Sequence, residues 1–466
     1  MENREEVPFN VTRELLIAIS NLLPDIVIVE TSCISNGSIM ASGDRTEDFR
    51  TQLMSISSTQ SSEAVVVMSF AIGIFAIYCL LKRANDLFHT SKFSSKEYNI
   101  PPGDMSLPFI GNMFTFFTTF KYGAPDSFIS YFTSRYGQGG MYKAFMFGTP
   151  SIIVTKPQVC KKILMDDDNF ELGWPKSVLN LIGKKALHGI TSQEHKRLRR
   201  ITTSPIKGKH ALSLYLGLIE EVVKSSFEKW NVIEEKPIKF LSEMKKSTFE
   251  VIIRIMIGSE IDPQWLDMVE KVYTIYLKGF LALPINLPGF AYHRAFKEEQ
   301  EEIVKRRLPD SDKKLSYDEI RQMKYLTKVI DETLRCSNVT LAIYRNAKRT
   351  INMNGYTIPK GWKVLTWIRQ VNLDPNNHVN PKEFNPSRWD DDEAKTFSVF
   401  LPFGAGPRLC PGAELAKLEV SVFLHYFLLN YRLERLNPKT SVTYLPIPSP
   451  TDNCLARLKR ISSSCQ

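Results

Sequence analysis

Ten residues near the C-terminal end carry the strongest chemical signal in this chain: Phe403-Gly404-Ala405-Gly406-Pro407-Arg408-Leu409-Cys410-Pro411-Gly412. Glycines on both sides of Cys410 let the backbone turn tightly and approach a flat ligand. Pro411 suits the first turn of a helix, and apolar residues recur at helical spacing from Ala413 to Tyr431. The spacing predicts that Cys410 lies just ahead of a buried helix, whose N-terminal dipole and free N–H groups favour an anionic sulfur.

The neighbours of Cys410 suit a thiolate bound to a metal cofactor. Phe403 can shield the sulfur from water, and Arg408 can pair with a carboxylate such as a haem propionate. A lone Cys-Pro-Gly would favour a simpler interpretation, a glycine-rich turn ahead of a core helix that includes a buried cysteine. The remaining residues of the run decide between a metal-bound thiolate and a simple turn.

The full run resembles the cysteine-ligand signature of the cytochrome P450 monooxygenases, F-x-x-G-x-R-x-C-x-G, at every fixed position: Phe403, Gly406, Arg408, Cys410 and Gly412. Such a match rarely arises by chance, so the functional interpretation is favoured. The resemblance implies that Cys410 is the axial ligand of the iron of haem b, in a pocket that includes Phe403, Gly404, Gly406 and Arg408. It also implies electrons from NADPH through a reductase, and a mainly α-helical fold with a small β-region.

Composition and cysteine usage limit the alternatives. A net charge of +10 over 466 residues suits an anionic membrane surface or an acidic protein partner, and no concentrated basic block points to nucleic acid. Seven scattered cysteines, odd in number and without a C-x-x-C pair, argue against a disulfide framework and a zinc cluster. They favour a reducing compartment.

The N-terminal part predicts a tail and a membrane anchor. Residues 1–62 are rich in Ser and Thr and lack a signal-peptide pattern, so we expect a disordered tail or upstream sequence wrongly joined to the gene. Ala64–Leu81 is uncharged and just long enough to cross a bilayer, which predicts a single anchor over residues 63–83. A buried core helix is the alternative. Lysine and arginine follow this stretch whereas acidic residues precede it, so the body should face the cytosol from the endoplasmic reticulum membrane.

Residues 84–104 are expected to form a proline-rich linker. Within it, Tyr98–Asp104 contains Pro101-Pro102-Gly103 and is expected to be a stiff exit from the membrane without secondary structure. The monooxygenase domain then spans 105–466. Within it, 142–146 and 151–154 read as two strands joined by a turn at 148–150, a helix is expected over 157–167, and Asn354-Gly355 predicts a hairpin turn.

A basic helix is predicted over Gln193–Arg200, with His195 and Arg199 on one face. By itself, such a run is typical of a solvated surface. In the resembled family the corresponding helix has a W-x-x-x-R pattern whose arginine binds a haem propionate, so Arg199 inherits that role. His195 stands where tryptophan is usual and is a second candidate donor. The other charges of this helix suit either solubility or the docking of an acidic reductase.

Glu332 and Arg335 are one helical turn apart, and Arg388 follows in Phe384-Asn385-Pro386-Ser387-Arg388-Trp389. An E-x-x-R pair alone carries little information. Together the three residues match the family's buried charge triad, in which two guanidinium groups share one carboxylate. The resemblance implies a structural role, holding the supports of the cysteine loop.

One family feature is missing. The family requires a long apolar helix across the distal face of the haem, with an A-G-x-[D/E]-T type sequence that delivers protons to dioxygen. No such sequence lies between Arg199 and Glu332, so no catalytic acid–alcohol pair is identified. We expect an internal truncation near Lys297/Glu298 from skipped exons or an incomplete gene model. We also expect that this exact chain is inactive as an oxygenase and binds haem poorly.

Within the family, the stretch from Pro101 to Arg457 is most similar to plant ent-kaurenoic acid oxidases of gibberellin synthesis, and β-amyrin 11-oxidases look nearly as similar. Both groups act on rigid apolar polycyclic terpenoids. Three functions stay open: oxidation of a diterpenoid acid, oxidation of a triterpenoid, and a non-catalytic remnant. A structural helical protein without a cofactor is disfavoured by the cysteine loop and the triad together.

Overall fold

The computed structural model describes residues 46–93, 97–121, 125–175, 192–231, 236–258, 315–390, 399–444 and 448–461, with isolated residues at 187, 190, 262, 264, 266, 268 and 269. In the first helix, side chains are described from residue 66 onward. The chain divides into two compact units, Met1–Ile74 and Phe75–Gln466. All the motifs around Cys410 and Glu332 lie in the second unit.

The apolar stretch belongs to one long helix, α2 (Thr46–Thr90), followed by a short turn of 3₁₀ helix, η1 (Ser91–Phe93). Within the described residues, Val66–Phe93 is long and apolar enough to cross a membrane, and none of its most apolar window is buried. A core helix would bury such residues against the rest of the protein. The exposure therefore disfavours the core-helix alternative, while the predicted anchor over residues 63–83 stays a prediction.

The predicted linker, residues 84–104, begins with the last turns of α2, and its proline-rich part, Tyr98–Asp104, differs from the expectation because it contains a short strand. Helix α2 continues to Thr90, and Gly103–Asp104 form strand β1, which pairs in parallel with β2 (Met141–Met146). Polar contacts fix the last turns of α2: Lys82 Nζ lies 2.5 Å from Asp104 Oδ2, and Asn85 Nδ2 donates to the carbonyl of Met105 at 3.0 Å. The segment is therefore held to the domain rather than free.

A six-stranded mixed sheet contains the predicted strand pair, in the order β1-β2-β3-β9-β6-β4. Strands β2 and β3 are antiparallel, as predicted, but their turn begins one residue earlier, at Phe147, which has a φ of 54°. The predicted hairpin is also present, with Asn354 and Gly355 at φ of 53° and 80°. The strands are β3 (Thr149–Val154), β4 (Phe170–Leu172), β6 (Ile343–Ala347), β7 (Ile351–Met353), β8 (Tyr356–Ile358) and β9 (Lys363–Thr366).

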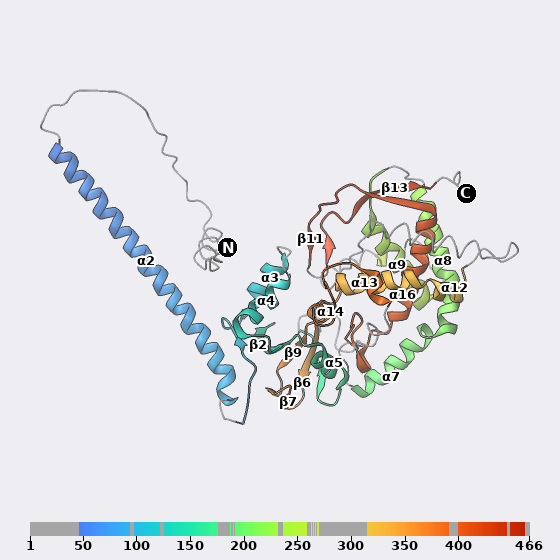
Figure 1. Ribbon diagram of the computed structural model, residues 1–466, viewed down its shortest axis with the longest axis horizontal. Coiled ribbons are helices and arrows are strands. Elements are labelled where there is room, and N and C mark those ends of the chain that lie inside the picture. The colour runs from blue at the N-terminus through green and yellow to red at the C-terminus, as the bar shows by residue number, and fades with distance from the viewer. Residues whose placement is uncertain are drawn as a thin grey trace, which may run out of the picture. The chain divides into compact units, whose positions relative to one another are not determined.

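Helices make up most of the remaining described structure, and Figure 1 shows α8, α9, α13 and α16 gathered together, apart from strands β6, β7 and β9. Their apolar faces form one core, which includes Leu216, Val222 and Leu418. The helices are α3 (Met113–Lys121), α4 (Pro125–Tyr136), α5 (Pro157–Met165), α7 (Ser192–Thr203), α8 (Lys209–Asn231), α9 (Phe240–Ile257), α12 (Tyr317–Gln322), α13 (Lys324–Ser337), α14 (Ile368–Asn372) and α16 (Ala413–Asn430).

The short elements complete the described fold. They are η2 (Ser204–Ile206), η3 (Pro386–Trp389), η4 (Gly406–Arg408), β5 (Ile238–Lys239), β10 (Tyr431–Arg435), β11 (Val442–Thr443), β12 (Ser449–Pro450) and β13 (Leu455–Arg460). The expected mainly α architecture with a small β-region is confirmed. The predicted truncation near Lys297/Glu298 falls outside the described residues, as do residues 1–45 of the predicted tail. Residues 46–62 of that tail are helical in α2, which differs from the expected disorder.

An aromatic core joins α3 and α4 to the sheet. Phe128 of α4 is fully buried and stacks on Trp367, with ring centroids 5.3 Å apart. We expect Phe128→Ala to lower the free energy of unfolding by about 3–5 kcal/mol, because a large aromatic side chain leaves a cavity. Urea unfolding followed by circular dichroism measures the change. The matched control is Phe114→Ala on the exposed face of α3, where the side chain is 68% exposed and the expected loss is small. Equal losses for both variants would contradict this assignment of the core.

Candidate functional site

The cysteine loop ends where α16 begins. Cys410 is half-buried, its backbone N–H donates to the carbonyl of Phe403 at 3.0 Å, and Gly412 is the N-cap residue of α16. Cys410 therefore lies just ahead of a buried helix, as the sequence predicted. The described contact between Phe403 and Cys410 runs through the backbone, so shielding of the sulfur by the Phe403 ring stays a prediction.

The glycines of the loop serve packing within the protein. Gly404 and Gly406 have φ of 79° and 69°, a region that side chains rarely adopt. A Cβ on Gly406 would lie 2.6 Å from the carbonyl oxygen of Leu164 in α5. Gly412, by contrast, has a φ of −92° and open space around it. Gly406 therefore allows α5 to approach the loop, and the approach of a ligand to the three glycines stays a prediction.

Burial raises the pKa of the Cys410 thiol above its ordinary value, although a backbone hydrogen bond from Gly412 and the positive charge of Arg199 act in the opposite direction. The backbone N–H of Gly412, at the N-terminus of α16, favours an anionic sulfur as the sequence indicated, but burial has the larger effect on this thiol. A buried thiol of this kind loses its proton when a metal ion coordinates the sulfur. The environment therefore suits a metal-bound thiolate better than a free one.

Three arginines from different elements gather around the cysteine loop. Arg199 of α7 acts electrostatically on both Cys410 and Arg408. Arg345 of β6 is 2% exposed, and burial followed by repulsion from Arg408 lowers its pKa to about 10, against the pull of Asp167. Asp167 pairs with Arg408 at 3.7 Å between Oδ2 and Nε.

The positive charge of this cluster exceeds the negative charge that faces it. Within the described residues, Asp167 is the carboxylate that acts on Arg345 and Arg408. Burial, then repulsion from Arg199, lowers the pKa of Arg408, and its Nη1 is buried without a hydrogen-bond partner. Buried guanidinium groups require anions. The cluster therefore fits a ligand with carboxylates beside a thiolate-bound metal, as the two propionates of haem would provide.

The structure adds Arg345 to the residues that the sequence indicated. No motif marks Arg345. The sequence signal that could have found it is an arginine inside a strand, because an arginine that is fully buried there needs a partner. His195 is 3% exposed on α7, and its contact with a propionate stays a prediction. Lys196, Arg197 and Arg200 lie exposed on the same helix.

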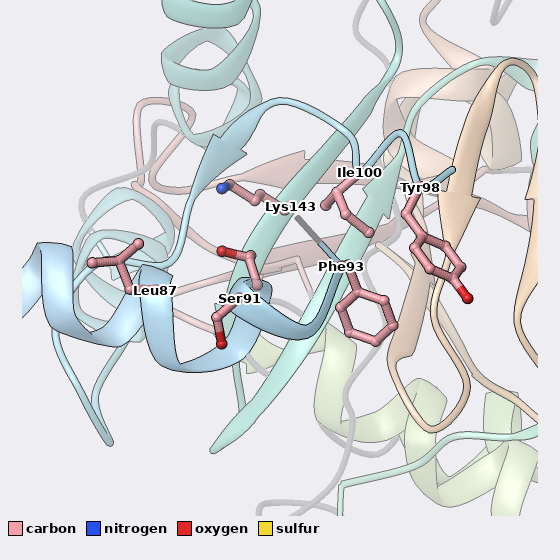
Figure 2. A pocket seen from close by; sticks show the side chains of 7 residues that line it. Leu87, Ser91, Phe93, Tyr98, Ile100 and Lys143 are labelled. Atoms are coloured by element: carbon pink, nitrogen blue, oxygen red, sulfur yellow. The ribbon is translucent and has the colours of Figure 1, made fainter. Parts of the chain in front are cut away.

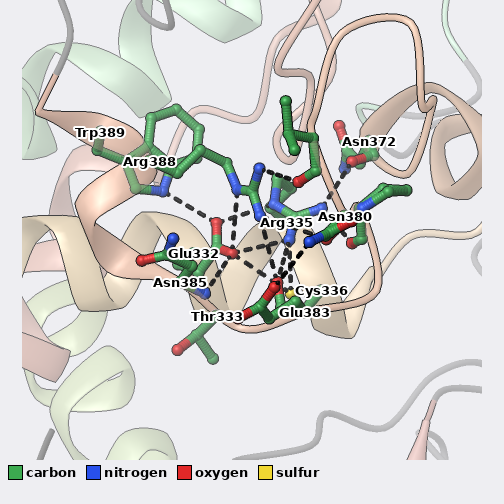
Figure 3. Close-up of polar contacts among 12 residues, drawn as sticks. Glu332, Thr333, Arg335, Cys336, Asn372, Asn380, Glu383, Asn385, Arg388 and Trp389 are labelled. Atoms are coloured by element: carbon green, nitrogen blue, oxygen red, sulfur yellow. Dashed lines mark hydrogen bonds and ion pairs between the residues drawn. The ribbon is translucent and has the colours of Figure 1, made fainter.

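The charge triad forms as the sequence predicted (Figure 3). Glu332 and Arg335 are fully buried on α13, with 2.7 Å between Oε1 and Nη2, and Arg388 Nε lies 3.3 Å from the same carboxylate oxygen. The backbone N–H of Asn385 and the indole N–H of Trp389 donate to Glu332 at 2.9 and 3.1 Å. Burial opposes ionisation, but the hydrogen bonds and the positive charge of both arginines hold the pKa of Glu332 below its ordinary value.

A buried asparagine connects this triad to the chain that leads into the cysteine loop. Arg335 Nη1 donates to the carbonyl of Asn372 at 3.2 Å, and Asn372 Oδ1 accepts from the backbone N–H of Leu401 at 3.3 Å. Asn372 is fully buried, and its amide also donates to Asn338 at 2.8 Å. These contacts support the structural role that the sequence assigned to the triad.

A separate pocket of about 210 Å³ lies at the C-terminal end of α2 beside β2 (Figure 2). The residues that line it are Leu87, Thr90, Ser91, Phe93, Tyr98, Ile100 and Lys143, none of them from the cysteine loop. Its volume is below the usual range for small-molecule sites. The distal helix that the family requires, and for which the sequence offers no candidate, would lie between α9 and α13, where most residues are outside the described part of the chain.

Because Glu332 neutralises two buried guanidinium groups, we expect Glu332→Gln to cost about 3–5 kcal/mol of unfolding free energy at neutral pH. The folded-state pKa of Glu332 is lowered, so its contribution is present above the unfolded-state pKa and disappears as the pH falls through the folded-state pKa. Urea unfolding between neutral and acidic pH should therefore show the variant and the parent converging in acid. Glu171→Gln, at an exposed position on β4, is the control and should change little. A loss that stays constant down to acid would exclude the ionic role.

Comparison with known proteins gives relatives over most of the chain. Ent-kaurenoic acid oxidase 2 of Arabidopsis thaliana is 42% identical over 477 residues, which cover 84% of this chain and 96% of the relative. Beta-amyrin 11-oxidase of Glycyrrhiza uralensis is 40% identical, covering 82% of this chain and 95% of the relative. The predicted resemblance to these two groups is confirmed.

A solved structure of retinoic acid-bound cyanobacterial CYP120A1 shares the fold. It has a TM-score of 0.65 and 20% identity, and the match covers 78% of this chain and all of that one. The N-terminal residues 1–66 match a different model, described as a family of unknown function (DUF6865). The model for cytochrome P450 matches residues 101–292 and 290–448. The chain therefore belongs to the cytochrome P450 family, as a haem monooxygenase by descent that depends on a redox partner.

Proposed function

We propose that this chain has the site of a haem-thiolate monooxygenase that oxidises a polycyclic terpenoid, with ent-kaurenoic acid in gibberellin biosynthesis as the substrate. The observation that carries the proposal is the excess of positive charge around Cys410, where Arg345 and the side chain of Arg408 are buried and Arg199 is partly buried. Arg199, Arg345 and Arg408 would hold the haem propionates, and Cys410 would bind the iron. Bound haem supplies the iron that activates dioxygen, with electrons from a redox partner.

The substrate class follows from the relatives. One relative is named for oxidising ent-kaurenoic acid and another for oxidising β-amyrin, at 42% and 40% identity. These identities are too similar to separate a diterpenoid acid from a triterpenoid. Both substrates are rigid and apolar, and both would be bound mainly through burial of apolar surface. A triterpenoid oxidase of the β-amyrin type is therefore the second candidate substrate assignment.

The electron source and the location are part of the proposal. NADPH would supply electrons through a reductase, and the exposed Lys196, Arg197 and Arg200 of α7 would attract its acidic surface. The apolar part of α2 would anchor the protein in the endoplasmic reticulum membrane. Lys82 and Arg83 directly follow that part, which favours a cytosolic domain.

A specific observation favours a further candidate, a non-catalytic product that lacks the distal helix. The alignment with the Arabidopsis relative spans 477 positions but covers 84% of this 466-residue chain, which is about 391 residues. About 86 positions of that alignment therefore have no residue of this chain opposite them. The family match also breaks into two pieces that meet at residues 290–292, close to the predicted truncation at Lys297/Glu298. Without that helix the haem would lose one wall, and the proton-delivering pair would be absent.

Haem reconstitution tests the ligand assignment. We expect the parent chain to bind haem weakly and to show a thiolate-type spectrum, which Cys410→Ser abolishes because an alcohol oxygen does not replace a thiolate ligand. Cys79→Ser, at an exposed cysteine of α2, is the control and should keep the parent spectrum. A Cys410→Ser variant with an unchanged Soret spectrum would remove the basis of the whole site.

Sequencing the transcript across the Lys297/Glu298 junction separates the catalytic from the non-catalytic candidate. An intervening exon that encodes an A-G-x-[D/E]-T helix would favour an oxygenase, and the restored chain should then oxidise ent-kaurenoic acid with NADPH and a reductase. A confirmed junction favours the non-catalytic product. In that case the purified chain should show no turnover, and a ferrous carbon monoxide band of the thiolate type together with turnover would refute it.

A further inference from the structure

Two buried asparagines, Asn338 and Asn372, contact each other across two helices. Asn338 is the C-cap residue of α13, and Asn372 is the last residue of α14. They are 2% and 0% exposed, and Asn372 Nδ2 donates to Asn338 Oδ1 at 2.8 Å. We call these two side chains the amide bridge. Because an amide both donates and accepts hydrogen bonds, each member of the bridge has capacity for further partners.

At one end, the amide bridge is fixed to α13. Asn338 has a φ of 49°, the left-handed conformation in which asparagine can end a helix. Its Nδ2 donates to the carbonyls of Arg335 and Cys336 at 2.8 and 3.2 Å, which satisfies two of the free carbonyls at the helix end. The contact of Asn338 Oδ1 with Asn372 is additional to these bonds. Helix capping alone therefore does not account for the pair.

At the other end, the amide bridge holds the segment that leads into the cysteine loop. Asn372 Oδ1 accepts from the backbone N–H of Leu401 at 3.3 Å. The carbonyl of Leu401 in turn accepts from the N–H of Gly404 at 3.1 Å, at the first turn of the loop. The loop then closes through the bond from Cys410 N–H to the carbonyl of Phe403. Hydrogen bonds and short lengths of backbone thus connect the end of α13 to Cys410.

We propose that Asn338 and Asn372 are positioning residues for Cys410, because they fix the start of the loop and so the direction in which its sulfur faces the cofactor. This role rests on the haem site proposed above. Arg335 of the triad bonds to the backbone carbonyl of Asn372, whereas the bond to Leu401 comes from the Asn372 side chain. Loss of either amide leaves a buried partner unsatisfied and frees the start of the loop, while the triad stays intact.

The test measures how fast iodoacetamide alkylates the Cys410 thiol in the full chain without haem, at fixed pH and under native conditions. Mass spectrometry of the peptide that contains Cys410 gives the rate for this cysteine alone. We expect Asn372→Ala to speed the reaction at least about fivefold, because an unsatisfied buried group favours local opening. Asn338→Gly should also speed it, and glycine readily adopts the φ of 49°, so the helix end is kept.

The matched control is Asn112→Ala. Asn112 is 4% exposed, and its Oδ1 accepts from the backbone N–H of Phe145 at 2.9 Å, at strand β2 rather than at the loop. This variant loses the same kind of buried bond as Asn372→Ala. It should lower the free energy of unfolding in urea to a similar extent, yet leave Cys410 alkylation at the rate of the parent.

Equal acceleration in Asn372→Ala and in the control would reduce the amide bridge to general stability and overturn its positioning role, as would a parent rate in Asn338→Gly. If Asn372→Ala fails to fold, Asn338→Gly decides alone. After haem reconstitution, the same variants should shift the ferrous carbon monoxide band from the thiolate type toward that of a neutral thiol. A parent chain that binds no haem would overturn the proposed function, while the alkylation rates would still decide whether the amide bridge holds the loop.

Discussion

More positive charge gathers around the cysteine loop than the described part of the protein neutralises, with Arg345 and the side chain of Arg408 buried and Arg199 partly buried. Arg199, Arg345 and Arg408 come from a helix, a strand and the loop itself, and Asp167 is the carboxylate that acts on the last two. Such a cluster is costly without an anionic ligand. A haem with two propionates beside Cys410 would balance it, so cofactor binding and local stability are coupled.

A second charged network, centred on Glu332, supports the segment that leads into the cysteine loop. Glu332 is surrounded by hydrogen-bond donors, and Arg335 carries the connection to Asn372 and from there to the segment that precedes the loop. Every member is buried or nearly so, which makes the network intolerant of the loss of any one charge. The proximal side of the site is thus built from mutually dependent parts, whereas the distal side depends on a segment for which this sequence offers no candidate.

The attachment of the domain to α2 shows how local sequence can mislead. Pro101-Pro102-Gly103 suggested a linker with no regular structure, yet Gly103 enters a strand. The reason is tertiary: Lys82 finds a buried carboxylate on Asp104, and Asn85 finds two carbonyl groups. These partners make it favourable to continue the helix and to pair the strand. Neither contact is visible from composition.

The sequence alone predicted Cys410 as the candidate ligand and, through the family resemblance, the charge triad. It also predicted the strands around the two hairpin turns, because such turns depend on residue types at fixed short spacing. The resemblance to the cytochrome P450 family, which these motifs carry, also predicted that most of the fold is helical. Tertiary structure alone decided that Arg345 joins the cysteine loop, since strand β6 is brought there by pairing with β9 and β4. It likewise decided that burial raises the pKa of the Cys410 thiol. Desolvation depends on every atom packed around a group, and no local pattern encodes that sum.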